Sequence, residues 1–329
     1  MPEDTPVRPS PARRDRPVAV SARSRELLAL AERVAAADVT VMLTGESGVG
    51  KEIFARFIHA RSARAAGPFV AINCAAIPEP MLEATLFGHE KGAFTGATEA
   101  RAGKFELACA GTLLLDEVTE MALGLQAKLL RVLQEREVER LGAPRSRAVD
   151  VRVIATSNRN LREAVAEGRL REDLYYRLNV FPLQVPPLRE RAEDVVPLAR
   201  ELLARHASED EVPLLTEAAC RHLRGYRWPG NVRELENVVQ RALILQRHGE
   251  IDVDALQLDD AAELGGGQPT RTPGADLEAS LRASEGELIL EALRAEAGRR
   301  KAAAERLGIS PRTLRYKLAR LREQGVALP

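Results

Sequence analysis

The sequence predicts an α/β fold, in which a parallel sheet is flanked by helices and a smaller helical part follows. Short apolar runs of strand length alternate with helical patterns in the first half of the chain. The strand candidates are Val39–Leu43, Phe69–Ile72, Thr112–Leu115 and Val151–Ala155. Runs of this kind, separated by helices, favour strands buried in a parallel sheet. Beyond Pro186-Pro187 only helical patterns follow, so a separate helical subdomain is expected there.

Helices are predicted where apolar residues recur at spacings of three and four. These segments are Arg25–Ala37, Leu123–Glu135, Ala192–Ala207, Thr216–Gly225 and Asn231–Arg247. The chain is thereby divided into a Pro-rich disordered tail at 1–17, an α/β subdomain at 18–185 and a helical subdomain at 186–258. A flexible Gly- and Pro-rich linker at 259–276 and a basic helical domain at 277–329 complete the predicted order.

Composition limits the class of protein. The 329 residues suggest two or three domains, and 48 basic side chains balance 48 acidic ones. Residues 299–323 nevertheless hold nine Lys or Arg against two Glu, which predicts contact with a polyanion. Three separated cysteines and five histidines without ligand spacing argue against a disulfide scaffold and a zinc site. We see no secretory signal and no apolar run near the roughly 20 residues that span a bilayer, so we expect a cytoplasmic protein without membrane contact.

A phosphate-binding loop follows the first predicted strand. Its residues, Gly45-Glu46-Ser47-Gly48-Val49-Gly50-Lys51, fit the pattern G-x-x-x-x-G-K, and a helix is expected from Glu52 onward. Backbone N–H groups can approach phosphates at such glycines, the helix N-terminus favours anions, and Lys51 would reach the β- and γ-phosphates. Glu52 stands where Ser or Thr usually binds Mg²⁺, so another group or water must hold the metal. The alternative, a plain Gly-rich turn, would not account for the strand, the glycines, the lysine and the helix occurring together.

Two of the predicted strands end in polar residues. Leu113-Leu114-Leu115 runs into Asp116 and Glu117, which places both carboxylates at the carboxyl edge of the sheet. There Asp116 would organise Mg²⁺, directly or through water, and Glu117 would polarise an attacking water. The strand at residue 151 ends at Asn158, which would approach the γ-phosphate if that strand is inserted beside the first. Alone, Asn158 would be interpreted as a turn residue.

Arg171 and Arg177 lie six positions apart in a short polar segment. Charge that develops on a transferring phosphoryl group requires cationic donors, and such an arginine can come from a neighbouring subunit. From spacing alone, surface ion pairs with Glu172 and Asp173 are the simpler interpretation.

The hexapeptide Gly92-Ala93-Phe94-Thr95-Gly96-Ala97 lies between the phosphate loop and the acidic strand end. Glycine at both ends weakens a helix or a strand, so a mobile loop that presents Phe94 is predicted. The alternative is a surface turn with Phe94 directed inward.

The C-terminal segment predicts a helix-turn-helix. Gly308 ends a first helix, Ser310 is a good N-cap, and the second helix carries a buried leucine stripe. The candidate DNA contacts are Ser310, Arg312, Thr313, Arg315, Tyr316 and Lys317. Such a helix would enter the major groove, with its leading residues at the bases and the other basic residues at phosphates. The alternative is a helical hairpin with a solvated basic face.

Together these motifs resemble the AAA+ transcription activators that act on sigma-54 RNA polymerase, the bacterial enhancer-binding proteins of the NtrC type. The resemblance covers about Val18 to Asp254 and extends to the C-terminal segment, which is similar to a Fis-type domain. The Gly92–Ala97 hexapeptide is intact and matches the loop that contacts sigma-54 in that family. The resemblance implies an AAA+ P-loop fold with a helical lid, ATP hydrolysis with Mg²⁺, and binding to enhancer DNA.

The resemblance also implies residue roles. Gly45 to Glu52 match the family's phosphate loop, which normally has Glu after Lys, and Asp116 and Glu117 match the Mg²⁺ and water pair. The remaining matches are Asn73, a switch asparagine that holds the catalytic Glu; Asn158, the γ-phosphate sensor; Arg171 and Arg177, arginine fingers acting in trans; and Arg233, the second sensor. Trans-acting arginines imply a ring, expected to be a hexamer, and residues 277–297 would pair the DNA-binding domains as dimers.

Small departures from the family pattern leave every catalytic group in place. Thr85 stands where Glu is frequent, Thr156-Ser157-Asn158 replaces Ala-Thr-Asn, and Val49 replaces Thr. Residues 82–88 look like the flagellar-regulator branch. Two alternatives remain: a DNA-binding regulator with a decayed ATPase, and an AAA+ machine acting on another protein partner. The 17 residues before Val18 are too few for a receiver domain of about 100 residues. We therefore expect regulation by a partner in trans, by concentration, or by a missing part of a longer protein.

Overall fold

The computed structural model describes residues 16–94, 96–207, 212–246 and 249–258. Contacts divide the chain into one unit at Met1–Leu258 and a second at Asp259–Pro329. The predicted tail at residues 1–15, the linker, the helix-turn-helix with its candidate DNA contacts, and Thr95 lie outside the described residues.

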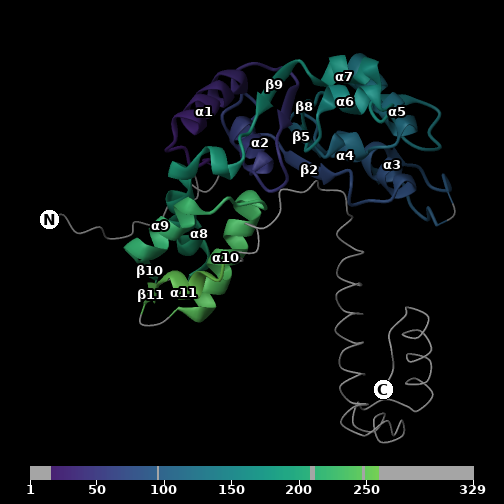
Figure 1. Ribbon diagram of the computed structural model, residues 1–329. Coiled ribbons are helices and arrows are strands. Elements are labelled where there is room, and N and C mark those ends of the chain that lie inside the picture. The colour runs from purple at the N-terminus through teal and green to yellow at the C-terminus, as the bar shows by residue number, and fades with distance from the viewer. Residues whose placement is uncertain (1–15, 95, 208–211, 247–248, 259–329) are drawn as a thin grey trace, which may run out of the picture. The chain divides into compact units, whose positions relative to one another are not determined.

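A parallel sheet forms the centre of the α/β subdomain (Figure 1). Its strands are β1 (Val41–Thr44), β2 (Phe69–Asn73), β5 (Thr112–Asp116), β8 (Arg152–Ser157) and β9 (Phe181–Gln184). Their order in the sheet is β2-β5-β8-β1-β9, and every neighbouring pair is parallel. The four predicted strands are confirmed, and β8 is inserted between β1 and β5. Strand β9 was not predicted, because Pro182 interrupts its apolar run; it lies at an edge of the sheet, where proline is tolerated.

Alternate residues of each strand enter two different cores. Leu113 and Leu115 of β5 belong to one cluster with Met42 of β1, whereas Leu114 belongs to a second cluster with Leu43. A strand turns successive side chains to opposite faces, so an uninterrupted apolar run requires cover on both faces. The helices provide this cover. Those of the second cluster are α1 (Ala22–Ala35) and α2 (Lys51–Ala60).

The opposite face is covered by a larger group of short helices (Figure 1). They are α3 (Glu79–Phe87), α4 (Lys104–Leu107), α5 (Leu123–Glu135), α6 (Leu161–Ala166) and α7 (Glu172–Leu178). Two small antiparallel pairs accompany them: β3 (Gly88–His89) with β4 (Arg101–Ala102), and β6 (Glu137–Glu139) with β7 (Ser146–Ala148). The bounds of α5 agree with the sequence prediction.

The helical subdomain has its own apolar core. It contains α8 (Val195–His206), α9 (Glu217–Gly225), α10 (Asn231–Leu245), α11 (Val253–Leu256) and the short parallel pair of β10 (Leu214–Leu215) with β11 (Glu250–Ile251). Trp228 is completely buried there, and its indole N–H donates to Leu223 O at 2.9 Å. Residues 192–194 form a 3₁₀ turn before α8 begins, and α10 ends two residues earlier than predicted. Within the described ranges, no helix combines the length and the apolar character needed to cross a bilayer.

A buried arginine joins α1 to the sheet. Arg152, the first residue of β8, is 3% exposed. Its guanidinium donates to Val34 O at 2.8 Å and to Ala35 O at 3.0 Å, which are carbonyls at the C-terminal end of α1. Burial lowers the pKa of this guanidinium, while Asp38 opposes that shift. Unpaired carbonyls at a helix end require a donor, and a cation is favoured there by the helix dipole.

Replacement of Arg152 by Met should therefore destabilise the α/β subdomain. The substitution leaves the carbonyl of Ala35 without its donor and takes one of the donors from Val34 O, which keeps the N–H of Ala37. The loss should be roughly 1 to 3 kcal/mol of unfolding free energy. Denaturant unfolding followed by circular dichroism measures the loss. Arg162→Met, at an exposed position of α6, is the matched control and should leave stability unchanged. Equal stability of the two variants would contradict the role given to Arg152.

Candidate functional site

The phosphate-type loop connects β1 to α2 at the carboxyl edge of the sheet. Two of its glycines have a left-handed backbone, with φ of +77° at Gly48 and +98° at Gly50. At Gly50 this conformation starts α2 and leaves open space around the missing Cβ. A Cβ at Gly48 would lie 2.6 Å from Gly230 O, so the helical subdomain approaches the loop backbone closely. The loop thus requires glycine both for its conformation and for this contact.

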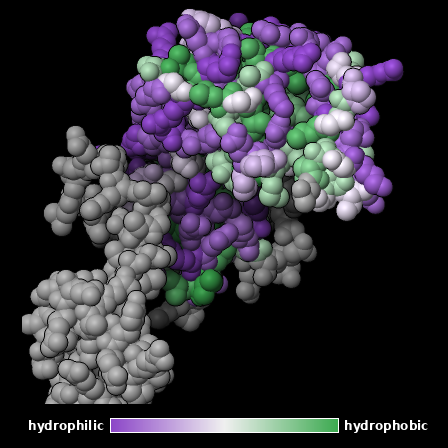
Figure 2. Space-filling view, turned by 90° about the vertical axis from the view of Figure 1, so that its right-hand side faces the viewer, coloured by the Kyte–Doolittle hydropathy of each residue, from purple (hydrophilic) through white to green (hydrophobic). Residues whose placement is uncertain are grey.

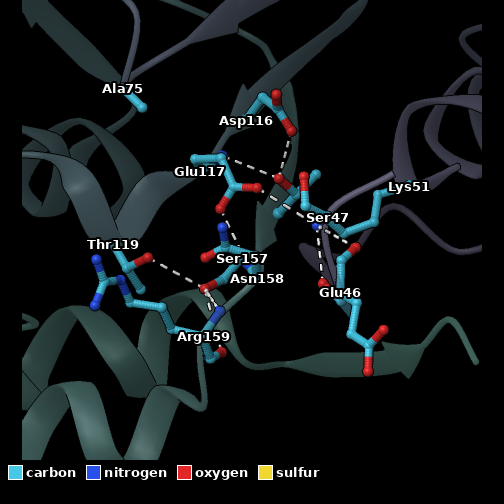
Figure 3. Close-up of polar contacts among 12 residues, drawn as sticks. Glu46, Ser47, Lys51, Ala75, Asp116, Glu117, Thr119, Ser157, Asn158 and Arg159 are labelled. Atoms are coloured by element: carbon cyan, nitrogen blue, oxygen red, sulfur yellow. Dashed lines mark hydrogen bonds and ion pairs between the residues drawn. The ribbon is translucent and has the colours of Figure 1, made fainter. Parts of the chain in front are cut away.

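Lys51 is the first residue of α2, and its side chain is 7% exposed. Its ammonium donates to Gly45 O at 2.9 Å and to Glu46 O at 3.2 Å. The same nitrogen lies 3.4 Å from Glu117 Oε1 (Figure 3). A cation is therefore held between the loop and the acidic end of β5.

The two predicted carboxylates are held in different ways. Asp116 Oδ1 accepts a hydrogen bond from Thr156 Oγ1 at 2.6 Å, and the same hydroxyl accepts from Glu117 N at 3.0 Å. Glu117 has a left-handed backbone with φ of +55°, and its Oε2 accepts from the backbone N–H of Asn158 at 3.0 Å (Figure 3). The strands thus bring Asp116, Glu117 and Asn158 together, as predicted. The bridging role of Thr156 was missed, although its place beside Asp116 follows from the pairing of Leu115 with Ala155.

Asn73 contacts a different carboxylate from the one expected. Its side-chain Nδ2 donates to Asp116 Oδ2 at 2.9 Å, and its side-chain Oδ1 accepts from the backbone N–H groups of Ala75 and Ala76. The register explains the difference, because Asn73 is paired directly with Asp116 across β2 and β5. Glu117, one residue further on, is directed to Lys51 and Asn158 instead.

The helical subdomain contacts the loop through the start of α10. Arg233 Nη1 donates to Ser47 Oγ at 3.0 Å, and Val232 N donates to Gly48 O at 2.9 Å. Asn231, which is completely buried, donates to Ser47 O and to Glu46 Oε2, both at 3.1 Å. The predicted position of Arg233 near the loop is therefore observed, whereas Asn231 was not predicted.

Two arginines before α8 were also missed. Arg189 donates to both carboxylate oxygens of Glu46, at 2.8 and 2.5 Å, and lowers the pKa of that carboxyl. Arg191 is 3% exposed and donates to Val49 O at 2.7 Å. Its Nε has no hydrogen-bond partner among the described residues, and burial lowers its pKa. In the sequence both resemble ordinary surface charges, because their partners lie more than 140 residues away.

These groups surround a cleft of about 300 Å³. The loop residues Ser47–Phe54 and the pair Asp116–Glu117 line one part, and Leu198, Leu202 and Arg233 of the helical subdomain line another. Glu52 is at the cleft as well, but its carboxylate pairs with Arg56 on the exposed side of α2. Within the described residues no group of three or more acidic, His or Cys side chains is placed to hold a metal; Asp116 and Glu117 form a pair.

Arg171 is the N-cap residue of α7 and Arg177 lies within that helix. Helix α7 lies beside α5 and α6 (Figure 1). Arg171 forms an ion pair with Asp173 at 2.8 Å, and Arg177 donates to Leu133 O at 2.7 Å. Among the residues that line the cleft, neither arginine is present. The cleft and the two arginines are thus separate features of one chain.

The hexapeptide loop closes on itself. Gly92 N donates to Ala97 O at 2.8 Å, and Ala97 N donates to Phe94 O at 3.0 Å. Phe94 is 44% exposed and contacts the ring of His89 edge-on, with centroids 5.0 Å apart. The inward alternative therefore does not describe Phe94, which is partly presented to solvent.

The β6–β7 hairpin contacts the residues that precede this loop. Leu141 N donates to Gly88 O and Glu90 N donates to Leu141 O, each at 2.9 Å, and Arg140 forms a bidentate pair with Glu106. Figure 2 views the side on which α3 and α5 lie, where hydrophobic residues occur among hydrophilic ones. Exposed hydrophobic side chains of this region are Met81, Phe94 and Leu123.

Comparison with known proteins gives consistent matches along the chain. Residues 18–184 match the sigma-54 interaction domain, residues 189–271 the AAA+ ATPase lid domain, and residues 280–321 the Fis family of bacterial regulatory proteins. The response regulator protein FleR of Pseudomonas aeruginosa is 55% identical over 341 residues, which cover 95% of this chain and 71% of FleR. The transcriptional regulatory protein FlbD of Caulobacter vibrioides is 46% identical over 317 residues, covering 92% of this chain and 70% of FlbD.

A solved structure gives the same fold. NtrX from Brucella abortus in complex with ATP matches with a TM-score of 0.68 and 35% identity, covering 93% of this chain and 69% of NtrX. Its complex with ADP matches with a TM-score of 0.69.

Replacement of Asn231 by Asp should weaken the contact between the helical subdomain and the loop. The change keeps the side-chain volume and suits the left-handed backbone (φ of +53°), but places a buried carboxylate beside that of Glu46. We expect a loss of roughly 2 to 4 kcal/mol at pH 7, measured by thermal unfolding.

The same experiment at lower pH identifies the cause. Burial and Glu46 raise the folded-state pKa of the new carboxyl above its unfolded value of about 3.9. The loss should therefore shrink as the pH falls from 7 toward 5. If the loss of stability is the same at pH 7 and at pH 5, the cause is a change in the backbone and not the charge of the new carboxylate.

Proposed function

Because the chain belongs to the sigma-54-dependent family of AAA+ transcriptional activators, we propose that it hydrolyses ATP to remodel sigma-54 RNA polymerase. In this proposal a ring of subunits binds enhancer DNA and converts the closed promoter complex to the open one. The observation that supports it most directly is the meeting of Lys51, Asp116 and Glu117 beside the glycine loop, in a cleft bordered by Arg233.

ATP fits the chemistry of this cleft. The loop offers backbone N–H groups and the N-terminus of α2 to an anion, and Lys51 supplies a cation in the same place. The lid residue Arg233, held at Ser47, adds a second cation at the loop. The relative NtrX has been crystallised with ATP and with ADP. In our proposal residues Gly45–Glu52 therefore surround the phosphates.

Asp116 and Glu117 fit a Mg²⁺ ion that is shared with the nucleotide. In phosphate-binding sites Mg²⁺ keeps several waters and takes only one or two carboxylates from the protein. Asp116 would hold the ion directly or through water, with its orientation fixed by Thr156 and Asn73. When bound, the ion neutralises charge on the β- and γ-phosphates.

Glu117 is the proposed general base. Its Oε2 accepts from the N–H of Asn158, and its Oε1 lies 3.4 Å from the Lys51 ammonium, so the carboxylate is oriented beside the glycine loop. An ionised carboxylate in this place can accept a proton from an attacking water. Asn158, which follows β8, is the proposed sensor, because the same residue contacts Glu117 and stands at the cleft edge of the sheet.

Arg171 and Arg177 are proposed to act on the nucleotide of a neighbouring subunit. Arg171 caps α7 and Arg177 lies within it, and neither lines the cleft of its own chain. They would therefore serve hydrolysis only if another subunit presents its cleft to them. A cationic donor at the transferring phosphoryl group accelerates such reactions by about 10³- to 10⁵-fold. We therefore propose a ring, with six subunits as the expected number.

The Gly92–Ala97 loop is the proposed contact with sigma-54, with Phe94 already partly exposed. The Fis-type segment would bind double-stranded enhancer DNA as a dimer, through Ser310, Arg312, Thr313, Arg315, Tyr316 and Lys317. A regulator in trans remains part of the proposal. Its presence would be revealed by activity that rises when the partner is removed.

Replacement of Glu117 by Gln should separate ATP binding from hydrolysis. The amide keeps the size and the acceptor for Asn158 N–H but cannot take a proton, so kcat should fall by about 10² to 10⁴ while ATP affinity stays near that of the wild type. A phosphate-release assay and equilibrium binding of labelled ATP measure the two quantities. Glu120→Gln, three residues further and exposed, is the matched control. A wild type without ATPase activity would favour a decayed enzyme.

Replacement of Thr95 by Ala should reduce sigma-54 binding without affecting hydrolysis. With a transition-state analogue of ATP bound, we expect binding to sigma-54 to weaken by roughly tenfold or more, as for a residue at the centre of an interface. Thr98→Ala, just outside the loop and exposed, should bind as the wild type does. Equal binding by all three proteins would point to an AAA+ machine with another partner.

A further inference from the structure

A buried amide connects the acidic strand end to the helix of the two arginines. Gln126 of α5 is completely buried. Its Nε2 donates to Met121 O at 2.8 Å and to Arg169 O at 2.7 Å, and its Oε1 accepts from the backbone N–H of Arg171 at 2.9 Å. A side chain of this polarity is buried at high cost unless it is fully paired, and here each of its two polar atoms is paired.

The first connection leads to the nucleotide cleft. Met121 ends the 3₁₀ turn Val118–Glu120, which directly follows Glu117. The turn is short, so the position of Met121 depends closely on the end of β5. Gln126 therefore fixes the start of α5 relative to the segment that holds the proposed general base.

The other two connections lead to the arginine helix. Arg171 is the N-cap residue of α7, and its backbone is held by Gln126 while its side chain is exposed and paired with Asp173. Near the other end of α5, Leu133 O accepts from the guanidinium of Arg177 at 2.7 Å. Helix α7 is thus held along α5 at two points, and Gln126 fixes the position of the N-terminal end of α7, where Arg171 lies.

We propose that Gln126 is a positioning residue for Arg171, and that it serves the active site of the neighbouring subunit rather than its own. This inference rests on the proposed function, in which Arg171 acts in trans. A donor displaced by about 1 Å loses on the order of 10²-fold in rate, so the cost of disturbing the Arg171 backbone should appear in hydrolysis and not in ATP binding.

The variants are Gln126→Met, which removes both polar atoms at similar volume, and Gln126→Glu, which keeps the acceptor for Arg171 N–H and replaces the donor. Gln134→Met is the matched control, since the same substitution falls on an exposed position of the same helix. We expect both Gln126 variants to bind ATP as the wild type does. Gln126→Met should hydrolyse it about 10- to 100-fold more slowly, and Gln126→Glu should lose less, because it keeps the acceptor for Arg171 N–H. The control should be unaffected.

Mixed rings then distinguish the two subunits that share a site. A Gln126 variant mixed with Glu117→Gln should regain ATPase activity, because the second chain supplies an intact Arg171 to the intact cleft of the first. The same variant mixed with Arg171→Ala should regain none, because neither chain then presents a functional arginine.

Three outcomes would overturn the proposal. If the Gln126 variant regains activity with Arg171→Ala but not with Glu117→Gln, Gln126 acts on Glu117 of the same chain, through Met121. Rescue by neither would show a general structural role, as would loss of ATP binding in both variants. The mixture of Glu117→Gln with Arg171→Ala is run in parallel. If that mixture stays inactive, the trans role of Arg171 itself is wrong, and the failure belongs to the proposed function.

Discussion

The parallel register of β5 with its two neighbours is the constraint on which the site depends. Asn73 is paired with Asp116, and Leu115 with Ala155, so the polar residues that end three different strands arrive at one edge. Pairing of β1 with β8 places the start of the glycine loop beside the same edge, where Gly45 N donates to Ser157 O. A slip of one residue in any pair would turn these side chains to the opposite face. The chemistry of the cleft is therefore a consequence of strand pairing.

The glycine loop is contacted on one side by the sheet and on the other side by the lid. On the side of the sheet, Glu117 at the end of β5 lies 3.4 Å from the Lys51 ammonium. On the side of the lid, Asn231 and Arg189 contact Glu46. Because both sets of contacts are made by one short loop, a change in the loop backbone alters the contact with Glu117 and the contacts with the lid. Glu46 gives the lid a charged contact with the loop, and Gly48 lets the lid backbone approach it. The loop is thus a joint between the two subdomains as well as a phosphate-binding element.

The features that depend on short stretches of sequence were predicted. Four strands, the span of α5, the glycine loop and the acidic strand end follow from apolar runs and from motifs. What was missed depends on the partners of single side chains. Four such side chains are Arg152, Thr156, Arg189 and Gln126. Their partners are carbonyls, carboxylates or backbone N–H groups, most of them 40 to 143 residues away, and no local pattern reveals them. Asn73 was recognised, but its partner was assigned one residue too far, because only the register distinguishes Asp116 from Glu117.

Helix α5 gives these separate features a common support. It begins after the turn that follows Glu117 and is tied at Gln126 to the start of α7. It ends at Glu135, and the left-handed backbone of the C-cap residue Arg136 leads directly into β6. The β6–β7 hairpin in turn contacts Glu90, two residues before the Gly92–Ala97 segment, through Leu141 and Arg140. Helix α5 is packed against the core through Leu125, Leu129 and Val132, and a close-packed interior is little compressible and transmits strain. The acidic strand end, α7 and the hairpin beside the exposed loop are all attached to this one helix, which gives a shift at one of them a physical route to the others.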